Sequence, residues 1–88
     1  MGDKYRVRPK TEVYGIEVNG AFQAYRAVDL EDRGRIEDSV GGARTVIERD
    51  PSGEVNAVNL DNGEEILVLK MLWFAWYAFH PETGLYAQ

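Results

Sequence analysis

An almost unbroken apolar stretch, residues 66–79, lies in the last third of this 88-residue chain and constrains its fold more than any other feature. Lys70 is its only charged residue, and half of the aromatic residues of the chain lie between Trp73 and Phe79. A membrane-spanning helix needs about 20 apolar residues, so this stretch is too short to cross a bilayer. It must therefore supply the core of a small domain or form an apolar surface.

The spacing of these residues predicts a helix over residues 69–79, which ends before Pro81 because a proline disfavours helical backbone in the residue preceding it. Such a helix carries two apolar stripes, the first formed by Leu69, Leu72, Trp73, Trp76 and Phe79 and the second by Lys70, Phe74 and Tyr77. Burial in the core is the first interpretation, because a small domain needs large buried side chains. The alternative is that Trp76, Tyr77 and His80 remain exposed as a ligand platform or docking face.

The pair Asn19-Gly20 between two β-type runs predicts a hairpin over residues 13–25, because this pair favours a type I′ turn. A two-residue loop fixes the register of the two strands. On one face it places Tyr14 opposite Tyr25, Ile16 opposite Gln23 and Val18 opposite Ala21, and on the other face Gly15 opposite Ala24. The first face is the better candidate for the core.

Turn signals at Gly41-Gly42, at residues 50–53 and at residues 61–63 divide the middle of the chain into short segments. They predict strands over residues 36–40, 43–49, 54–60 and 64–69. The charged segment 27–34 predicts at most one helical turn before Gly34.

Closely spaced strands of this kind favour an antiparallel arrangement that a single apolar helix can cover. We therefore predict an α+β fold, mostly β: a small antiparallel meander or half-open barrel of about six strands with one apolar C-terminal helix. We expect a single domain over residues 1–88, with an ordered core over about residues 12–86 and a flexible segment at residues 1–10. The predicted core consists of Tyr14, Ile16, Val18, Tyr25, Val46, Val58, Leu67, Leu69, Leu72, Trp73, Trp76 and Phe79.

Composition argues against several classes of function. A net charge of −5 and a pI near 4.8 argue against sequence-independent nucleic-acid binding, which depends on Lys and Arg neutralising phosphates. The chain has no cysteine, so disulfides, thiolate nucleophiles and zinc sites with cysteine ligands are excluded. No glycine-rich loop opens a helix, so we predict no nucleotide cofactor. The acidic pairs Glu37-Asp38 and Glu64-Glu65 are interpreted as solvated surface.

Residues 1–10 are polar and charged and lack the apolar segment of a signal peptide. We therefore expect the chain either to act in the cytoplasm or to be a domain of a longer exported protein.

His80 is the only histidine, so a metal site with two histidines is excluded. Its position at the predicted helix end favours a capping or exposed role, because a cation meets the negative end of the helix dipole there. A metal or catalytic site would need carboxylates that folding brings close to His80, such as Glu82 with Asp38 or Glu48.

Three segments of the chain, in order, resemble a prokaryotic family known as domain of unknown function 3179. They are residues 13–20 with Ala24-Tyr25, residues 38–42, and residues 73–83 with Leu85-Tyr86, and together they cover about residues 13–86. The resemblance implies a domain of an exported or membrane-associated protein with no assigned reaction. Longer family members place a Cys-Pro-x-Cys pair where this chain has residues 50–53, so a thiol or soft-metal role does not carry over.

Three functions fit these observations. The first is a non-catalytic binding or interaction module that receives a protein or small molecule at the aromatic helix end formed by Trp76, Tyr77 and His80. The second is a structural or oligomerisation domain whose aromatic face packs against another copy. The third is a metal-dependent accessory or enzymatic domain that uses His80 and nearby carboxylates. We expect the first, because aromatic residues are abundant while catalytic motifs are missing. Neither direct membrane insertion nor nucleic-acid binding is expected, and the sequence leaves the oligomeric state open.

Overall fold

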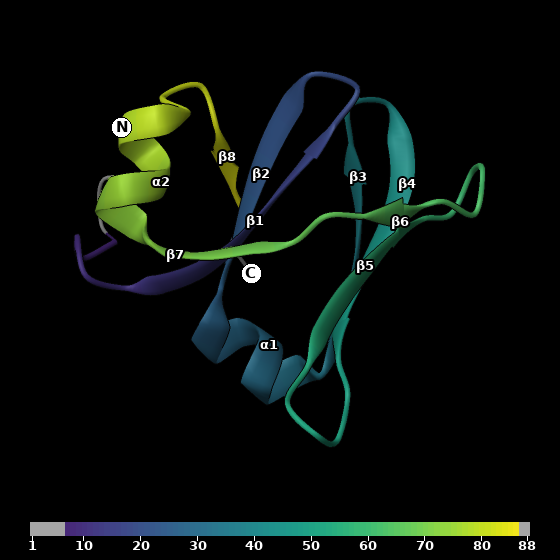
Figure 1. The fold of residues 1–88 in the computed structure, drawn as a ribbon, viewed down its shortest axis with the longest axis horizontal. Helices are drawn as coiled ribbons and strands as arrows, with labels where there is room; N and C mark the ends of the chain where they lie inside the picture. The colour runs from purple at the N-terminus through teal and green to yellow at the C-terminus, as the bar shows by residue number, and fades with distance from the viewer. Residues whose placement is uncertain (1–6, 87–88) are drawn as a thin grey trace.

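The computed structural model describes residues 7–86 and shows two four-stranded sheets with two short helices (Figure 1). The elements in chain order are β1 Glu12–Val18, β2 Ala21–Arg26, α1 Ala27–Arg33, β3 Arg35–Val40, β4 Ala43–Arg49, β5 Val55–Asn59, β6 Glu65–Ile66, β7 Leu69–Leu72, α2 Trp73–Phe79 and β8 Gly84–Leu85. Most of the segment that we expect to be flexible, residues 1–10, lies outside the described residues.

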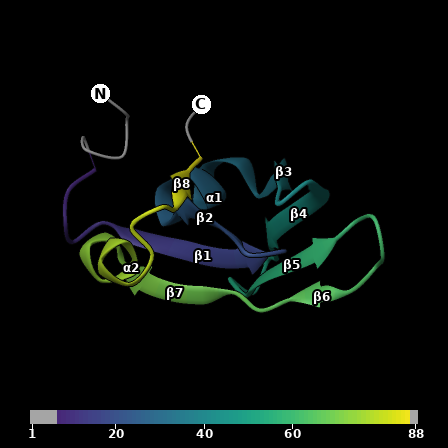
Figure 2. The same ribbon diagram turned by 90° about the horizontal axis from the view of Figure 1, so that it is seen from above.

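The two sheets are built from different parts of the chain. The second sheet, in the order β3-β4-β5-β6, is a contiguous antiparallel meander. The first sheet, in the order β7-β1-β2-β8, joins the N-terminal hairpin to two C-terminal strands. β7 pairs antiparallel with β1, and β8 pairs parallel with β2. Figure 2 shows the chain running from β6 to β7 along one border of the molecule, which connects the second sheet to the first.

The prediction of a small, mostly β, α+β domain is confirmed, but several of its details are wrong. Residues 7–86 form eight strands instead of about six, and these strands lie in two sheets that do not close into a barrel. The segment expected to form at most one helical turn is the seven-residue helix α1. The helix predicted over residues 69–79 begins only at Trp73, because Leu69–Leu72 extends instead as β7 and pairs with the free edge of β1.

The β1–β2 hairpin has the predicted register, with Val18 opposite Ala21 at its turn. Asn19 has a φ of 52° and Gly20 a φ of 82°, the left-handed backbone that a type I′ turn requires. The side-chain amide of Asn19 also donates a hydrogen bond of 3.0 Å to the carbonyl of Gly41, in the turn between β3 and β4. The tips of the two hairpins are therefore linked.

The core divides into two clusters of buried side chains, one on each face of the first sheet. The larger cluster lies between the two sheets and consists of Ile16, Val18, Tyr25, Leu30, Ile36, Val40, Ala43, Ile47 and Ala57. The smaller cluster lies between the first sheet and α2 and consists of Val13, Ala24, Trp73 and Trp76. β1 contributes to both clusters because successive side chains of a strand point to opposite faces.

The predicted core is correct on the strands of the hairpin and for both tryptophans, and wrong at the end of α2, on β7 and in the segment between the sheets. Ile16, Val18, Tyr25, Val46, Trp73 and Trp76 are buried, while Tyr14 and Val58 are partly buried. Four predicted core side chains are instead exposed: Leu67 at 75%, Leu69 at 44%, Leu72 at 36% and Phe79 at 72%. Leu69 and Leu72 stand on an edge strand instead of a helix, and Leu67 lies in the segment that connects the sheets.

A polar contact crosses from the first sheet to the second inside the larger cluster. Tyr25 donates a hydrogen bond of 2.8 Å from its hydroxyl to the Asp38 carboxylate, and Gln23 donates one of 3.2 Å to the same oxygen. Asp38 is therefore part of the packing between the sheets and not the free, solvated carboxylate that the sequence predicts. Burial of the phenol raises the pKa of Tyr25 well above its usual value, and the neighbouring Asp38 carboxylate raises it further.

This shift makes the domain sensitive to alkaline pH. The raised pKa means that Tyr25 ionises more readily in the unfolded chain than in the folded one. Its contribution to the free energy of unfolding is therefore present below about pH 10 and is lost as the pH rises further. We expect the free energy of unfolding, measured with urea and circular dichroism, to stay level up to about pH 9 and to fall as the pH rises through about pH 10 to about pH 11. The free energy of unfolding of the Tyr25→Phe variant should fall less over the same pH interval. An equal loss in both proteins would contradict this assignment.

Candidate functional site

The helix that carries the predicted site residues is held at both of its ends. Its first two N–H groups donate hydrogen bonds to the carbonyls of Thr11 and Pro9, at 2.7 and 2.9 Å. These bonds replace a side-chain cap, which α2 lacks. At the other end the N–H of His80 donates to the carbonyl of Trp76 at 2.9 Å, one residue before Pro81. The chain before β1 thus positions the start of α2.

Trp76 is the centre of the smaller cluster. It is 1% exposed, and its indole N–H donates a hydrogen bond of 2.8 Å to the hydroxyl of Thr83. Its ring lies so close to Gly15 of β1 that a Cβ atom at that position would overlap it. The core interpretation is therefore confirmed for Trp76, and the alternative in which its indole is exposed as a platform is wrong.

The other two predicted site residues lie in separate aromatic contacts. Tyr77 is partly buried and stacks on Trp73, with 5.5 Å between the ring centroids. His80 lies nearly parallel to Phe22 of β2, with 4.0 Å between the centroids and an angle of 16°, and it also contacts the Trp76 ring at 4.4 Å. The structure thus brings Trp76 and His80 together and leaves Tyr77 beside Trp73.

An apolar groove of about 270 Å³ lies where His80 and Trp76 meet the first sheet. We define this groove by its lining residues Gly15, Ile16, Glu17, Phe22, Leu67, Leu69, Trp76 and His80. Leu67 and Leu69, 75% and 44% exposed, are its most accessible apolar side chains. Glu17 and His80 are its only ionisable members. This arrangement suits an apolar group with a polar or charged neighbour.

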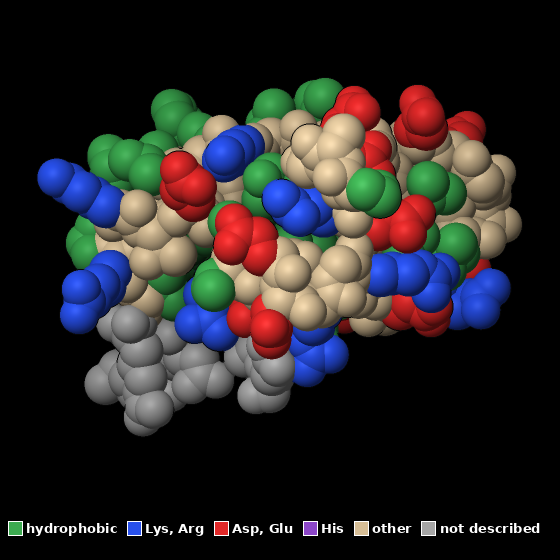
Figure 3. Space-filling view, turned by 90° about the horizontal axis from the view of Figure 1, so that it is seen from below, with side chains coloured by type: hydrophobic (Ala, Val, Ile, Leu, Met, Phe, Trp, Pro, Cys, Tyr) green, Lys and Arg blue, Asp and Glu red, His purple; other side chains and the backbone are tan. Residues whose placement is uncertain are grey.

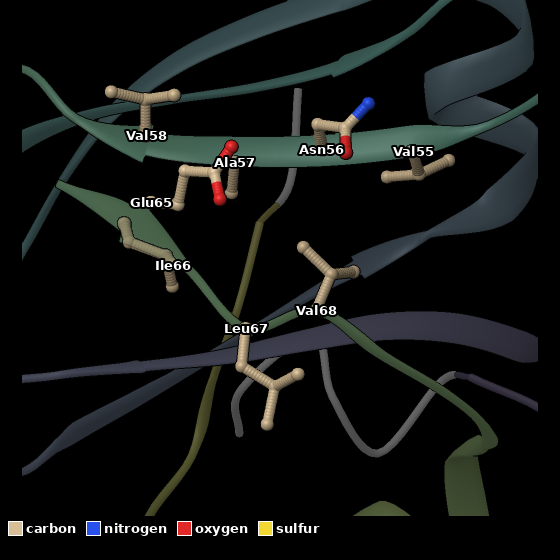
Figure 4. A pocket seen from close by; sticks show the side chains of 8 residues that line it. All are labelled: Val55, Asn56, Ala57, Val58, Glu65, Ile66, Leu67 and Val68. Carbon is tan, nitrogen blue, oxygen red and sulfur yellow. The ribbon is translucent and has the colours of Figure 1, made fainter.

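The groove exists because residues 67–68 pair with neither sheet. β6 ends its pairing with β5 at Ile66, and β7 begins its pairing with β1 at Leu69. A second hollow, of about 440 Å³, opens on the other side of these residues, between them and β5 (Figure 4). In Figure 4, Val68 points toward β5, whereas Leu67 points away from it. The unpaired segment therefore separates two hollows, both of which include Leu67.

Residues 7–86 contain no group of three or more Asp, Glu or His side chains that could hold a metal ion. The carboxylate of Asp38 accepts hydrogen bonds from Tyr25 and Gln23, and His80 packs between aromatic rings. His80, Glu82 and Asp38 or Glu48 consequently do not form a metal cluster in the described part of the chain. Neither described helix is long and apolar enough to span a membrane.

Sequence reasoning missed Phe22, Leu67 and Leu69 as members of the site. The hairpin register contained a partial signal, because it places Phe22 opposite Glu17 on the face of β1 that also carries Gly15. It could not show that this face receives α2.

The fold and the site together define a small, mostly β, α+β domain with an apolar surface groove. Searches with the sequence and the structure found no match among models of protein families, curated proteins or solved structures.

Proposed function

We propose that this chain is a non-catalytic binding module whose apolar groove receives an apolar group of a partner. The observation that carries the proposal is the concentration of exposed apolar side chains at this end of the described structure. Leu67, Leu69, Leu72, Phe74 and Phe79 are each between 36% and 75% exposed and lie within one segment of the chain. An apolar group in the groove would remove part of this surface from water, which is favourable in proportion to the area covered.

The charged surface is compatible with a local site of this kind. Figure 3 shows a face on which Lys and Arg side chains are interspersed with Asp and Glu, while hydrophobic side chains gather toward the end where α2 lies.

The sequence resemblance to domain of unknown function 3179 supports the proposal that the module works within a longer exported or membrane-associated protein.

A structural or oligomerisation role is the second candidate, and a separate observation favours it. Phe74 and Phe79 are 53% and 72% exposed and do not line the groove. Exposed aromatic side chains of this kind are typical of surfaces that pack against a protein. Sedimentation equilibrium over a wide range of concentrations distinguishes the two roles, since a monomer at all concentrations excludes self-association.

The binding proposal predicts a localised response to neutral apolar probes. N-acetyl-leucinamide and N-acetyl-phenylalaninamide should shift the amide signals of Gly15, Phe22 and Leu69 and the indole signal of Trp76 in NMR correlation spectra. Leu69→Ser should weaken this binding by about fivefold or more, because a lost buried CH₂ group costs about 0.8 kcal/mol. Leu60→Ser is the matched control, since Leu60 is 37% exposed and lies outside the groove. An unperturbed spectrum, or equal weakening by both variants, would contradict the proposal.

A further inference from the structure

The apolar groove continues into an acidic hollow of about 240 Å³. This hollow is lined by Glu17, Val18, Asn19, Asn59, Asn62, Glu64, Glu65, Ile66 and Leu67. It shares Glu17 and Leu67 with the apolar groove, so the two are contiguous at these residues. One ligand can therefore contact apolar and acidic surfaces at the same time.

Three carboxylates of the acidic hollow have no cationic partner among the residues that the structure describes. No ion pair within residues 7–86 involves Glu17, Glu64 or Glu65. Lys70, next to Leu69 in the chain, pairs with Glu12 at 3.6 Å, and Arg44 pairs with Asp61, next to Asn62, at 3.3 Å. The chain as a whole carries a net charge of −5. An unbalanced cluster of negative charge beside an apolar groove attracts a basic ligand and repels an acidic one.

The backbone of β1 adds a third kind of contact. The N–H of Trp73 donates to the carbonyl of Thr11, so the odd-numbered residues along β1 direct their N–H and C=O groups toward β7. Pairing of β1 with β7 stops at Gly15 opposite Leu69, although the same register would place Glu17 opposite Leu67. The backbone groups of Glu17 therefore face the unpaired space, where an extended peptide can form hydrogen bonds with them.

From these observations we propose that the occupant of the groove is an extended basic peptide segment, an inference that rests on the proposed function. One bulky apolar side chain lies in the apolar groove against Phe22 and Leu69. A lysine or arginine two positions away reaches the carboxylates of Glu17, Glu64 and Glu65. This spacing follows because alternate residues of a strand share one face and lie about 7 Å apart.

Three capped pentapeptides test the inference. The first is Ac-Thr-Phe-Thr-Lys-Thr-NH₂, the second replaces its lysine with glutamate, and the third replaces its phenylalanine with alanine. NMR titration at low salt should show the lysine peptide binding about tenfold more tightly than the glutamate peptide, and the difference should shrink at about 0.5 M salt. The alanine peptide should bind at least about tenfold more weakly than its phenylalanine counterpart.

Two double variants that remove the same charge test whether the acidic hollow causes the preference for the lysine peptide over the glutamate peptide. Glu64→Gln combined with Glu65→Gln should reduce the preference for lysine over glutamate at least threefold. Glu31→Gln combined with Asp32→Asn removes the same charge from exposed positions on α1 and should leave the preference nearly unchanged. An equal reduction in the two double variants would overturn the role of the acidic hollow.

The outcomes separate this inference from the function on which it rests. Binding of N-acetyl-phenylalaninamide in the groove, with no preference between the lysine and glutamate peptides, would overturn the basic peptide and leave the binding module intact. No response to the neutral probes or to any of the peptides would overturn both.

Discussion

Replacing Trp76 with alanine is expected to lower the free energy of unfolding by about 3–5 kcal/mol. The side chain is 1% exposed, its ring forms a T-shaped contact with Phe22 at 6.1 Å between centroids, and its N–H donates to Thr83. The alanine variant loses the packing against β1 and the hydrogen bond that the buried Thr83 hydroxyl accepts from the indole. A domain of this size has only about 5–15 kcal/mol of stability in total.

Urea unfolding followed by circular dichroism measures the loss. Phe79→Ala is the control, because it truncates an aromatic residue of the same helix that is 72% exposed and should change stability by no more than about 0.5 kcal/mol. Trp76→Phe gives a graded comparison if the alanine variant does not fold. A change within about 1 kcal/mol for Trp76→Ala, the range of an ordinary surface substitution, would contradict the central position of this side chain.

Gly15→Ala is the second substitution with a large expected effect, a loss of about 1–3 kcal/mol from overpacking. Gly15 does not have the positive φ of the turn glycines, so the loss does not come from backbone strain. It comes from the new methyl group, which would overlap the six-membered ring of the Trp76 indole. That ring cannot move away easily, because it is buried and hydrogen-bonded to Thr83.

A double-mutant cycle isolates this contact. Trp76→Phe lacks the ring atoms that meet Gly15, so Gly15→Ala should cost at least about 1 kcal/mol less in that background. Gly84→Ala is the matched control, because the new methyl group there meets the flexible amide end of Gln23 instead of a rigid ring. Additive effects of Gly15→Ala and Trp76→Phe would show that the two residues do not interact as described.

The features that the sequence predicted correctly are those that local chemistry decides. Asn19 and Gly20 tolerate the left-handed backbone of their turn, and a two-residue turn leaves only one register for the hairpin. The assignment of Leu69–Leu72 to a helix was wrong because Leu69, Leu72 and Trp76 also fit helical spacing. The free edge of β1, which is distant in the sequence, decides in favour of a strand.

The candidate site was harder to predict than the fold. The aromatic segment correctly indicated Trp73 and Trp76 as core residues, but the groove depends on Phe22 and Leu67, which come from other parts of the chain. The stacking of His80 on Phe22 follows from how α2 lies against the first sheet. No spacing pattern in the sequence carries that information.

The placement of the tryptophans has a spectroscopic consequence. The chain has two, and both belong to the cluster between α2 and the first sheet, whereas the cluster between the two sheets has none. Intrinsic tryptophan fluorescence therefore reports on the attachment of α2, while circular dichroism reports on both sheets. If the two signals follow the same urea curve, the domain is one cooperative unit. If fluorescence changes first, α2 detaches while the sheets remain folded, and the apolar groove disappears before the fold does.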